Sequence, residues 1–412
     1  MTDLPTTTRS SIPNELRTRL SADPVKRLDE VIAYFRQHRQ PVELFEALKM
    51  KTRLRLGMSM VPPPDAETTS DPSPHGRQEE RELEDGLLDA CRQAGAMLIE
   101  DGKIAEGWMY LRPTGDTSLA KRLLSGVEIT DENYDEMVQI LLHEGVDLAR
   151  GYRAVLTQQG TCNSITLFDQ AIAERPRSDR ATAAACLLDH FYEELWSLVQ
   201  ADFRDRAPKH GVAPDSIEDE LGRTCLGELI TRHGWILGDG GYHLDTTHLS
   251  STVRFATVLT DREEIDKAVQ LCQYGKRLPA DFQYPGDEPF VDFYPAHLAY
   301  FNALLGRDVD TAVRLFEQKA RHVDVMEGGS GAIEVYVDLL DRLGRPAEAL
   351  TAAMELFPED VPTQRVMPDL MAMARSAMAA GHSDVVASLH DFLFERGDLL
   401  GVAAIAEIQP AT

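Results

Sequence analysis

The stretch that decides the fold is Leu343–Asp360, which reads LGRPAEALTAAMELFPED. An apolar segment ends at Gly344, a proline opens a second segment of helix-forming residues, and another proline ends that segment. Comparable breaks are centred on Gly306 and Gly381, so the three glycines are spaced 38 and 37 residues apart. Because glycine readily adopts the left-handed conformation that ends many helices, each break predicts a turn between two paired helices.

These units resemble the tetratricopeptide repeat and related α-solenoid families over residues 290–407. The period is longer than the ~34 residues of that repeat, and most units lack its aromatic signature. Similar breaks between helical segments lie earlier in the chain, at Asp101–Glu106 and His38–Glu43. The resemblance implies a curved, superhelical array with a concave binding surface, and leaves open whether the array is an open curve or a closed toroid.

The rest of the chain also has the periodicity of helices. Apolar residues step by three and four across Asp131–Leu156 and again across Asp179–Phe203, which predicts one long helix in each range. Runs that alternate apolar and polar residues are short, and no Asn-Gly or Asp-Gly hairpin turn lies between such runs. We therefore predict an all-α protein built from helix-pair repeats similar to tetratricopeptide repeats.

Composition and the positions of glycine and proline divide the chain into six predicted segments. The prolines of the third segment favour an extended linker, so we expect the hairpin before it to be tethered loosely. The segments are a disordered N-terminus (1–13), an αα-hairpin (14–56), a Pro-rich linker (57–77), a long-helix region (78–237), a loop-rich insertion with a candidate site (238–289) and the repeats (290–412).

Charge and cysteine content restrict the partners and the compartment. The chain has 68 acidic and 42 basic residues, a formal net charge of −26, which disfavours binding to nucleic acid or to an anionic membrane surface. Its five cysteines are scattered without a C-x-x-C pair, as in proteins with reduced thiols. The chain shows neither a secretory leader nor a run of 18 apolar residues, so we expect a cytoplasmic protein.

One stretch interrupts the helical pattern and is the best candidate for a site. Residues Gly238–Leu259 read GDGGYHLDTTHLSSTVRFATVL, with three glycines followed by His243, Asp245 and His248. Histidine and carboxylate side chains are ligands for divalent metals such as zinc or iron. The H-x4-H spacing is not a known metal signature, however. In the alternative interpretation, Asp245 or Thr246 caps a helix that begins near Thr247, and His243 is a hydrogen-bonded loop residue.

A second segment, Phe282–His297, lies downstream and is rich in aromatic residues and proline. If the two segments are adjacent, His243, His248 and His297 are candidate metal ligands. Asp245 is then a ligand or general base, and Arg254 holds an anionic substrate. The alternative for Arg254 is an ordinary surface charge.

Two functions remain open from the sequence. The first is a cytoplasmic helical-repeat protein that binds a protein or peptide on its concave face. The second is a metal-dependent enzyme acting on a small molecule, with a pocket built from the Gly238–Arg254 loop and the Phe282–His297 segment. Phosphate-binding, dinucleotide-binding and serine-hydrolase motifs are absent from the sequence, so the binding protein is the favoured hypothesis.

Overall fold

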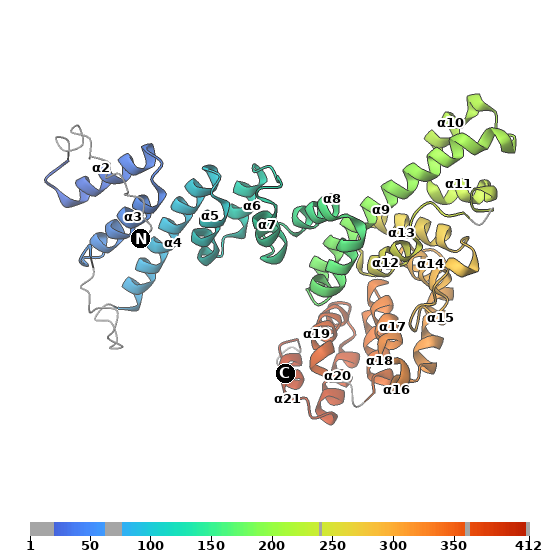
Figure 1. Ribbon diagram of the computed structural model, residues 1–412. Coiled ribbons are helices and arrows are strands. Elements are labelled where there is room, and N and C mark those ends of the chain that lie inside the picture. Colours follow the sequence, from blue (N-terminus) through green and yellow to red (C-terminus); the bar gives the residue numbers. More distant parts are fainter. Residues whose placement is uncertain (1–19, 62–75, 239–240, 359–362, 409–412) are drawn as a thin grey trace, which may run out of the picture. The chain divides into compact units, whose positions relative to one another are not determined.

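A computed structural model describes residues 20–61, 76–238, 241–358 and 363–408, and within these ranges all regular structure is helical (Figure 1). The predicted all-α class is therefore confirmed. The chain divides into two compact units, residues 1–154 and 155–412. This boundary lies inside the 78–237 region that the sequence pattern treats as a single segment. The predicted disordered segment 1–13 and most of the predicted linker lie outside the described residues.

The helices of the first unit are α2 (Pro24–Gln37), α3 (Pro41–Arg55), α4 (Arg77–Glu100), α5 (Ile104–Leu111), α6 (Thr117–Ser125) and α7 (Tyr134–Val138). Helix α8 (Leu148–Leu167) contains the boundary between the units. The helices of the second unit are α9 (Arg177–Arg206), α10 (Ile217–Arg223), α11 (Leu226–Arg232), α12 (Thr246–Phe255), α13 (Arg262–Gly275), α14 (Phe293–Leu304), α15 (Val309–His322), α16 (Val325–Gly328), α17 (Gly331–Arg342), α18 (Pro346–Leu356), α19 (Thr363–Ala379), α20 (Ser383–Glu395) and α21 (Leu399–Ile405).

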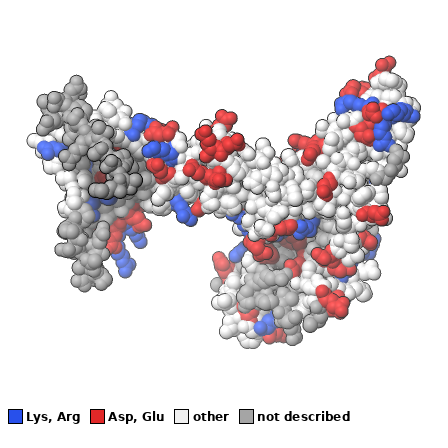
Figure 2. Space-filling model, in the orientation of Figure 1, with Lys and Arg blue, Asp and Glu red and all other residues white. Residues whose placement is uncertain are grey.

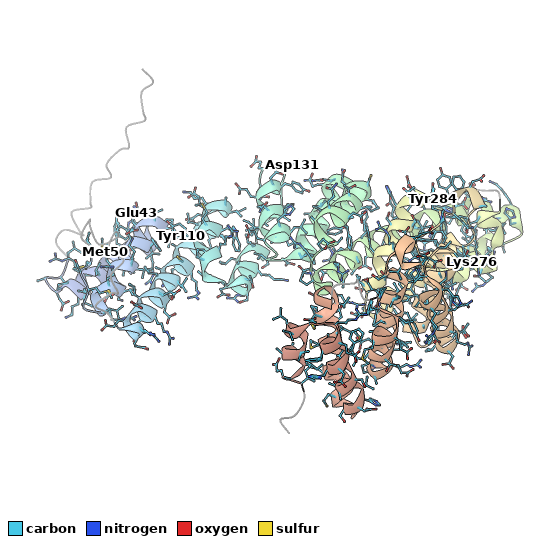
Figure 3. The ribbon with its side chains drawn as sticks, turned by 90° about the horizontal axis from the view of Figure 1, so that it is seen from below. Glu43, Met50, Tyr110, Asp131, Lys276 and Tyr284 are labelled. Atoms are coloured by element: carbon cyan, nitrogen blue, oxygen red, sulfur yellow. The ribbon has the colours of Figure 1, made fainter. Side chains whose placement is uncertain are left out.

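The N-terminal hairpin packs directly onto the helix that follows it. Helices α2 and α3 form the predicted pair, and both contribute to a buried apolar cluster that also contains Ala90 and Met97 of α4. Tyr110 of α5, labelled in Figure 3, lies edge-on to Phe45 of α3 at 5.2 Å between ring centroids. The expectation of a loose tether was therefore wrong. The apolar faces of α2 and α3 are buried by tertiary contacts that composition alone does not reveal.

The predicted turns are present in both units. Gly306, Gly344 and Gly381 have φ of 80°, 73° and 89° and join α14 to α15, α17 to α18, and α19 to α20. In the turn at Gly344, the amide of Arg345 donates to the carbonyl of Leu340 at 3.0 Å, and Gly344 donates to Asp341 at 2.9 Å. These are the paired hydrogen bonds of a Schellman motif, which satisfy carbonyls that the end of the helix leaves free.

The first unit repeats this turn twice. Gly102 has φ of 79° between α4 and α5, and Arg39 has φ of 51° between α2 and α3. The amides of Lys103 and Gln40 close the turns onto the carbonyls of Leu98 and Phe35, at 2.9 and 3.0 Å. The two similar breaks noted earlier in the sequence, at Asp101–Glu106 and His38–Glu43, are thus turns between paired helices.

Two further sequence expectations differ from the structure. The helix predicted across Asp131–Leu156 is broken, because α7 passes into a π-helical turn, Gln139–His143, and the chain reverses at Gly145 (φ 77°) before α8. Segment 238–289 is also more helical than predicted. It contains α12 and α13, and α13 packs on both α11 and α14, so this segment is part of the helical array rather than a loop-rich insertion.

Acidic side chains are spread over the visible face of both units and are interspersed with Lys and Arg (Figure 2). Among the described residues, no helix combines the length and apolar character that crossing a membrane requires.

Candidate functional site

Asp245 is the N-cap of α12. Its carboxylate accepts hydrogen bonds from the amides of Thr247 (2.8 Å) and His248 (3.4 Å) and from the Thr247 hydroxyl (2.6 Å). The hydroxyl and these amides lower the pKa of the Asp245 carboxyl. Capping, the alternative that the sequence allowed, accounts for all of these contacts, because the first amides of a helix have no partner within the helix.

His243 contacts Asp202 of α9 and Tyr274 of α13. The Tyr274 hydroxyl is 2.8 Å from Nδ1 and also accepts from the His243 amide at 3.0 Å, while Nε2 lies 3.5 Å from a carboxylate oxygen of Asp202. The arrangement fits a neutral imidazole that donates from Nε2 to Asp202 and accepts from Tyr274 at Nδ1. Burial lowers the pKa of His243, against the opposing influence of Asp202.

His297 is 1% exposed on α14. Its Nδ1 donates to the carbonyl of Phe293 at 2.8 Å, and its ring stacks on Phe290 at 3.9 Å between centroids. Nε2 is enclosed and has no hydrogen-bond partner among the described residues. Burial, reinforced by the charge of Arg254, lowers the pKa of His297 to about 4 despite the bond to Phe293. The imidazole is therefore neutral at pH 7, with Nε2 as a free acceptor.

The predicted metal ligands are held in separate environments. His243 faces Asp202 and Tyr274, His297 faces the aromatic residues of its own segment, and half-buried His248 lies in the first turn of α12. In the described part of the chain, no group of three or more His, Cys, Asp or Glu side chains is arranged to hold a metal ion. The three histidines proposed from the sequence are therefore not brought together as one ligand set there.

Arg254 and His297 do line one cavity, which we call the histidine cavity. It has a volume of about 330 Å³, and its walls come from the end of α12, the segment 284–290, α14 and α17. Tyr284, labelled in Figure 3, is part of its wall. One guanidinium nitrogen of Arg254 lies 3.0 and 3.1 Å from the two carboxylate oxygens of Asp169. The two predicted segments thus share a cavity, although His243, Asp245 and His248 do not line it.

A second cavity adjoins the first. It has a volume of about 270 Å³ and shares Thr257, Phe290 and Val335 with the histidine cavity. Its apolar lining includes buried side chains of α17 and α19, and charged residues surround them. We call it the acidic cavity; the charged residues that line it are Arg177, Arg180, Glu334, Asp338, Asp341 and Asp369.

A polar network fixes the wall of the acidic cavity. Arg177 of α9 binds the carboxylate of Asp338 on α17, and Tyr300 of α14 donates to the same carboxylate at 2.9 Å. Arg342 donates to Tyr300 at 2.9 Å and to the carbonyls of Thr257 (2.6 Å) and Leu259. Because these contacts join α9, α14, α17 and the segment 257–259, the network ties the three helices into one wall.

Two charged residues that line this cavity, Asp341 and Arg180, take no part in that network. Burial, followed by the negative charges of Asp338 and Asp369, raises the pKa of Asp341 even though Arg177 opposes the shift. The Nε of Arg180 is buried and has no hydrogen-bond partner among the described residues. Unsatisfied buried groups are rare in folded proteins, so the Nε of Arg180, at the same cavity as a carboxyl with a raised pKa, marks this cavity as a candidate binding site.

The sequence analysis did not identify the acidic cavity. Arg177 and Asp338 are 161 positions apart, and nothing local relates them. A signal was present within α17, where Asp338 and Asp341 occupy positions i and i+3 beside buried Val337 and Leu340. Charged side chains at the edge of an apolar helical face indicate a boundary of the core, but the pattern does not reveal which element they meet.

Comparisons with known proteins do not assign this chain to a family. No protein-family model matches the chain, and no curated protein matches it. A solved structure described as a "Circular tandem repeat protein with novel repeat topology and enhanced subunit contact surfaces" is 15% identical, covers 93% of this chain and 87% of its own, and has a TM-score of 0.16. Similarity at that TM-score carries no argument. The helical-repeat architecture rests on the helices and turns described above, and the tetratricopeptide family remains a resemblance.

Proposed function

We propose that this protein binds a peptide segment of another protein, and that the acidic cavity of the second unit receives it. The segment would place an apolar side chain among Val337, Leu370 and Met373 and a basic group near Asp341 and Asp369. Helical arrays commonly present such sites on surfaces built from successive repeats. The proposal keeps the class of partner expected from the repeat resemblance, a protein or peptide.

The observation that carries this proposal is the charge imbalance of an otherwise apolar cavity. Four acidic residues and two arginines line it, and Arg177 is already paired with Asp338. Burial, followed by the negative charges of Asp338 and Asp369, raises the pKa of Asp341. A cation from a partner would stabilise Asp341 in its charged form. The buried Nε of Arg180 offers a donor to a peptide carbonyl, so one extended segment would satisfy both groups.

The charge of the whole chain favours the same class of partner. A net charge of −26 attracts basic segments and speeds their encounter with the protein. The alternative of a metal-dependent enzyme has no comparable observation in its favour, since the described structure does not gather its predicted ligands.

Peptide display followed by affinity measurement tests the proposal. We expect selected peptides to combine basic residues with an apolar residue. Asp341→Asn combined with Asp369→Asn should weaken their binding roughly tenfold, because each rim charge contributes at most about 1 kcal/mol. Met373→Glu should weaken it at least as much, because it places a charge in the apolar lining.

The matched control is Asp384→Asn combined with Glu395→Gln, which changes the net charge equally on exposed positions of α20. It should leave the affinity within about twofold, since exposed distant charges are screened by salt. Equal loss of affinity in both double variants would show that only the net charge matters. Unchanged affinity in Met373→Glu would place the peptide outside the acidic cavity.

A further inference from the structure

His297, one of the residues that line the histidine cavity, carries a hydrogen-bond acceptor that has no partner in the part of the chain that the structure describes. His297 commits Nδ1 to Phe293 on its own helix, and Nε2 has no partner among the described residues. The side chain is 1% exposed and belongs to the wall of a cavity of about 330 Å³. A buried, unsatisfied acceptor costs free energy, and a ligand that donates to it would remove that cost.

The other walls restrict what such a ligand can be. Phe290, Phe293 and Tyr284 supply aromatic surface, and prolines 285 and 289 add further apolar surface. Arg254 carries a positive charge close enough to influence His297. Asp287 and Glu288 add negative charge to the same lining, so neither sign of ligand charge is favoured there. The volume lies at the small end of the range for ligand sites, which suits a single ring. The best match is an uncharged aromatic group with one N–H or O–H donor.

We propose that the histidine cavity binds a phenol- or indole-type ring, whose donor is recognised by Nε2 of His297. The cavity shares three wall residues with the acidic cavity, so the ring belongs to a tyrosine or tryptophan of the bound peptide. This source of the ring rests on the proposed peptide-binding function. The recognition of the ring by His297 does not.

Entry of the ring requires a small movement of one wall. Nε2 is enclosed, so a donor reaches it only when the cavity opens. The segment from Gln283 to Val291 lies outside any helix, and it is the wall that deforms at the lowest cost.

Two small probes test the recognition directly. p-Cresol carries an O–H donor, whereas 4-methylanisole has the same ring without one. Titrations of the full-length protein followed by NMR should show saturable binding of p-cresol, roughly tenfold tighter than that of 4-methylanisole, because an unmade buried hydrogen bond is expensive. Equal affinity of the two probes, or no binding of p-cresol, would overturn the proposal without any variant.

A pair of variants then assigns the effect to one residue. His297→Phe keeps an aromatic ring beside Phe290 but removes the acceptor, so the advantage of p-cresol should disappear. His322→Phe is the control, since His322 also bonds to the carbonyl four residues before it on its helix but lies outside the cavity. A tenfold advantage that persists in folded His297→Phe would show that Nε2 is not the acceptor.

Synthetic peptides distinguish the two sources of the ring. Peptides selected on the acidic cavity should lose about tenfold in affinity when their tyrosine is changed to phenylalanine, and His297→Phe should remove this difference. If p-cresol binds as expected but no peptide depends on tyrosine or tryptophan, the ring comes from a free small molecule. In that case the histidine site stands and the link to peptide binding fails.

Discussion

The glycine turns and the histidine-bearing segments of the second unit differ in how far local sequence determines them. Gly306, Gly344 and Gly381 were expected to adopt a left-handed conformation, and all three do. His243 and His297 were expected to meet, yet each is held by a different set of neighbours. A turn depends on hydrogen bonds within six residues, whereas a shared site depends on how separate helices pack.

The turns of the two units also differ from each other. Both close with the same backbone hydrogen bonds, but the left-handed residue is Gly344 in one and Arg39 in the other. Arg39 donates to Asp101 at 2.8 Å, to Glu100 at 2.9 Å and to the carbonyl of Met97 at 3.0 Å. A side chain at this position thus costs backbone strain and gains a connection to α4, so tertiary contacts can replace the usual glycine.

The largest expected effect concerns the pH dependence of stability, which tests whether the side chain of His297 is buried. Its pKa is about 4 in the folded protein against 6.5 for an unperturbed imidazole, so the unfolded chain takes up the proton first as the pH falls. The contribution of His297 to the free energy of unfolding is therefore fully present above pH 6.5. It is lost as the pH falls from 6.5 to 4, and the loss reaches about 3 kcal/mol. His297→Phe removes the loss.

Urea denaturation at pH 7.5 and 5.5 measures it. The wild type should lose about 1.4 kcal/mol more than His297→Phe over this interval. Parallel losses in the two proteins would mean that His297 is hydrated, contrary to the burial described here.

The next effect concerns the turn at Gly344. A valine there should destabilise the second unit by about 2 kcal/mol, because φ of 73° is strained for a β-branched residue even though no atom lies within 4 Å of the added Cβ. Gly222→Val in α10 is the control. An added Cβ at Gly222 also has no atom within 4 Å, and the φ of Gly222 is not left-handed. The free energy of unfolding of this variant should therefore change by less than about 0.5 kcal/mol. Similar losses in both variants would show that backbone conformation is not the cause.

A smaller effect separates a helix cap from a catalytic role at Asp245. Asp245→Ala should lower the free energy of unfolding by about 1 kcal/mol, whereas Asp245→Asn should change it by only a few tenths, because asparagine caps nearly as well. Thermal denaturation followed by circular dichroism measures both. Equal destabilisation by alanine and asparagine would indicate that the charge of the carboxylate, not its capping geometry, matters.

The smallest effect is expected at Arg39. Arg39→Gly relieves the left-handed strain but loses exposed contacts with Glu100 and Asp101, so its net effect should lie within about 0.5 kcal/mol. Arg39→Ala keeps the strain and loses the contacts, and should be about 1 kcal/mol less stable than Arg39→Gly. A more stable alanine variant in urea denaturation would contradict the left-handed turn in the first unit.

Local sequence was sufficient to predict the helical class and the turns at Gly306, Gly344 and Gly381, because each depends on residues close together along the chain. For Asp245 it left a helix cap and a catalytic role both open, and the structure shows the cap. Packing decided the rest. The N-terminal hairpin docks onto α4, the helix expected across Asp131–Leu156 breaks near Gly145, and Arg177 meets Asp338 from 161 residues away. Such contacts depend on how apolar faces of separate helices are buried together, and periodicity shows only that a face exists, not what covers it.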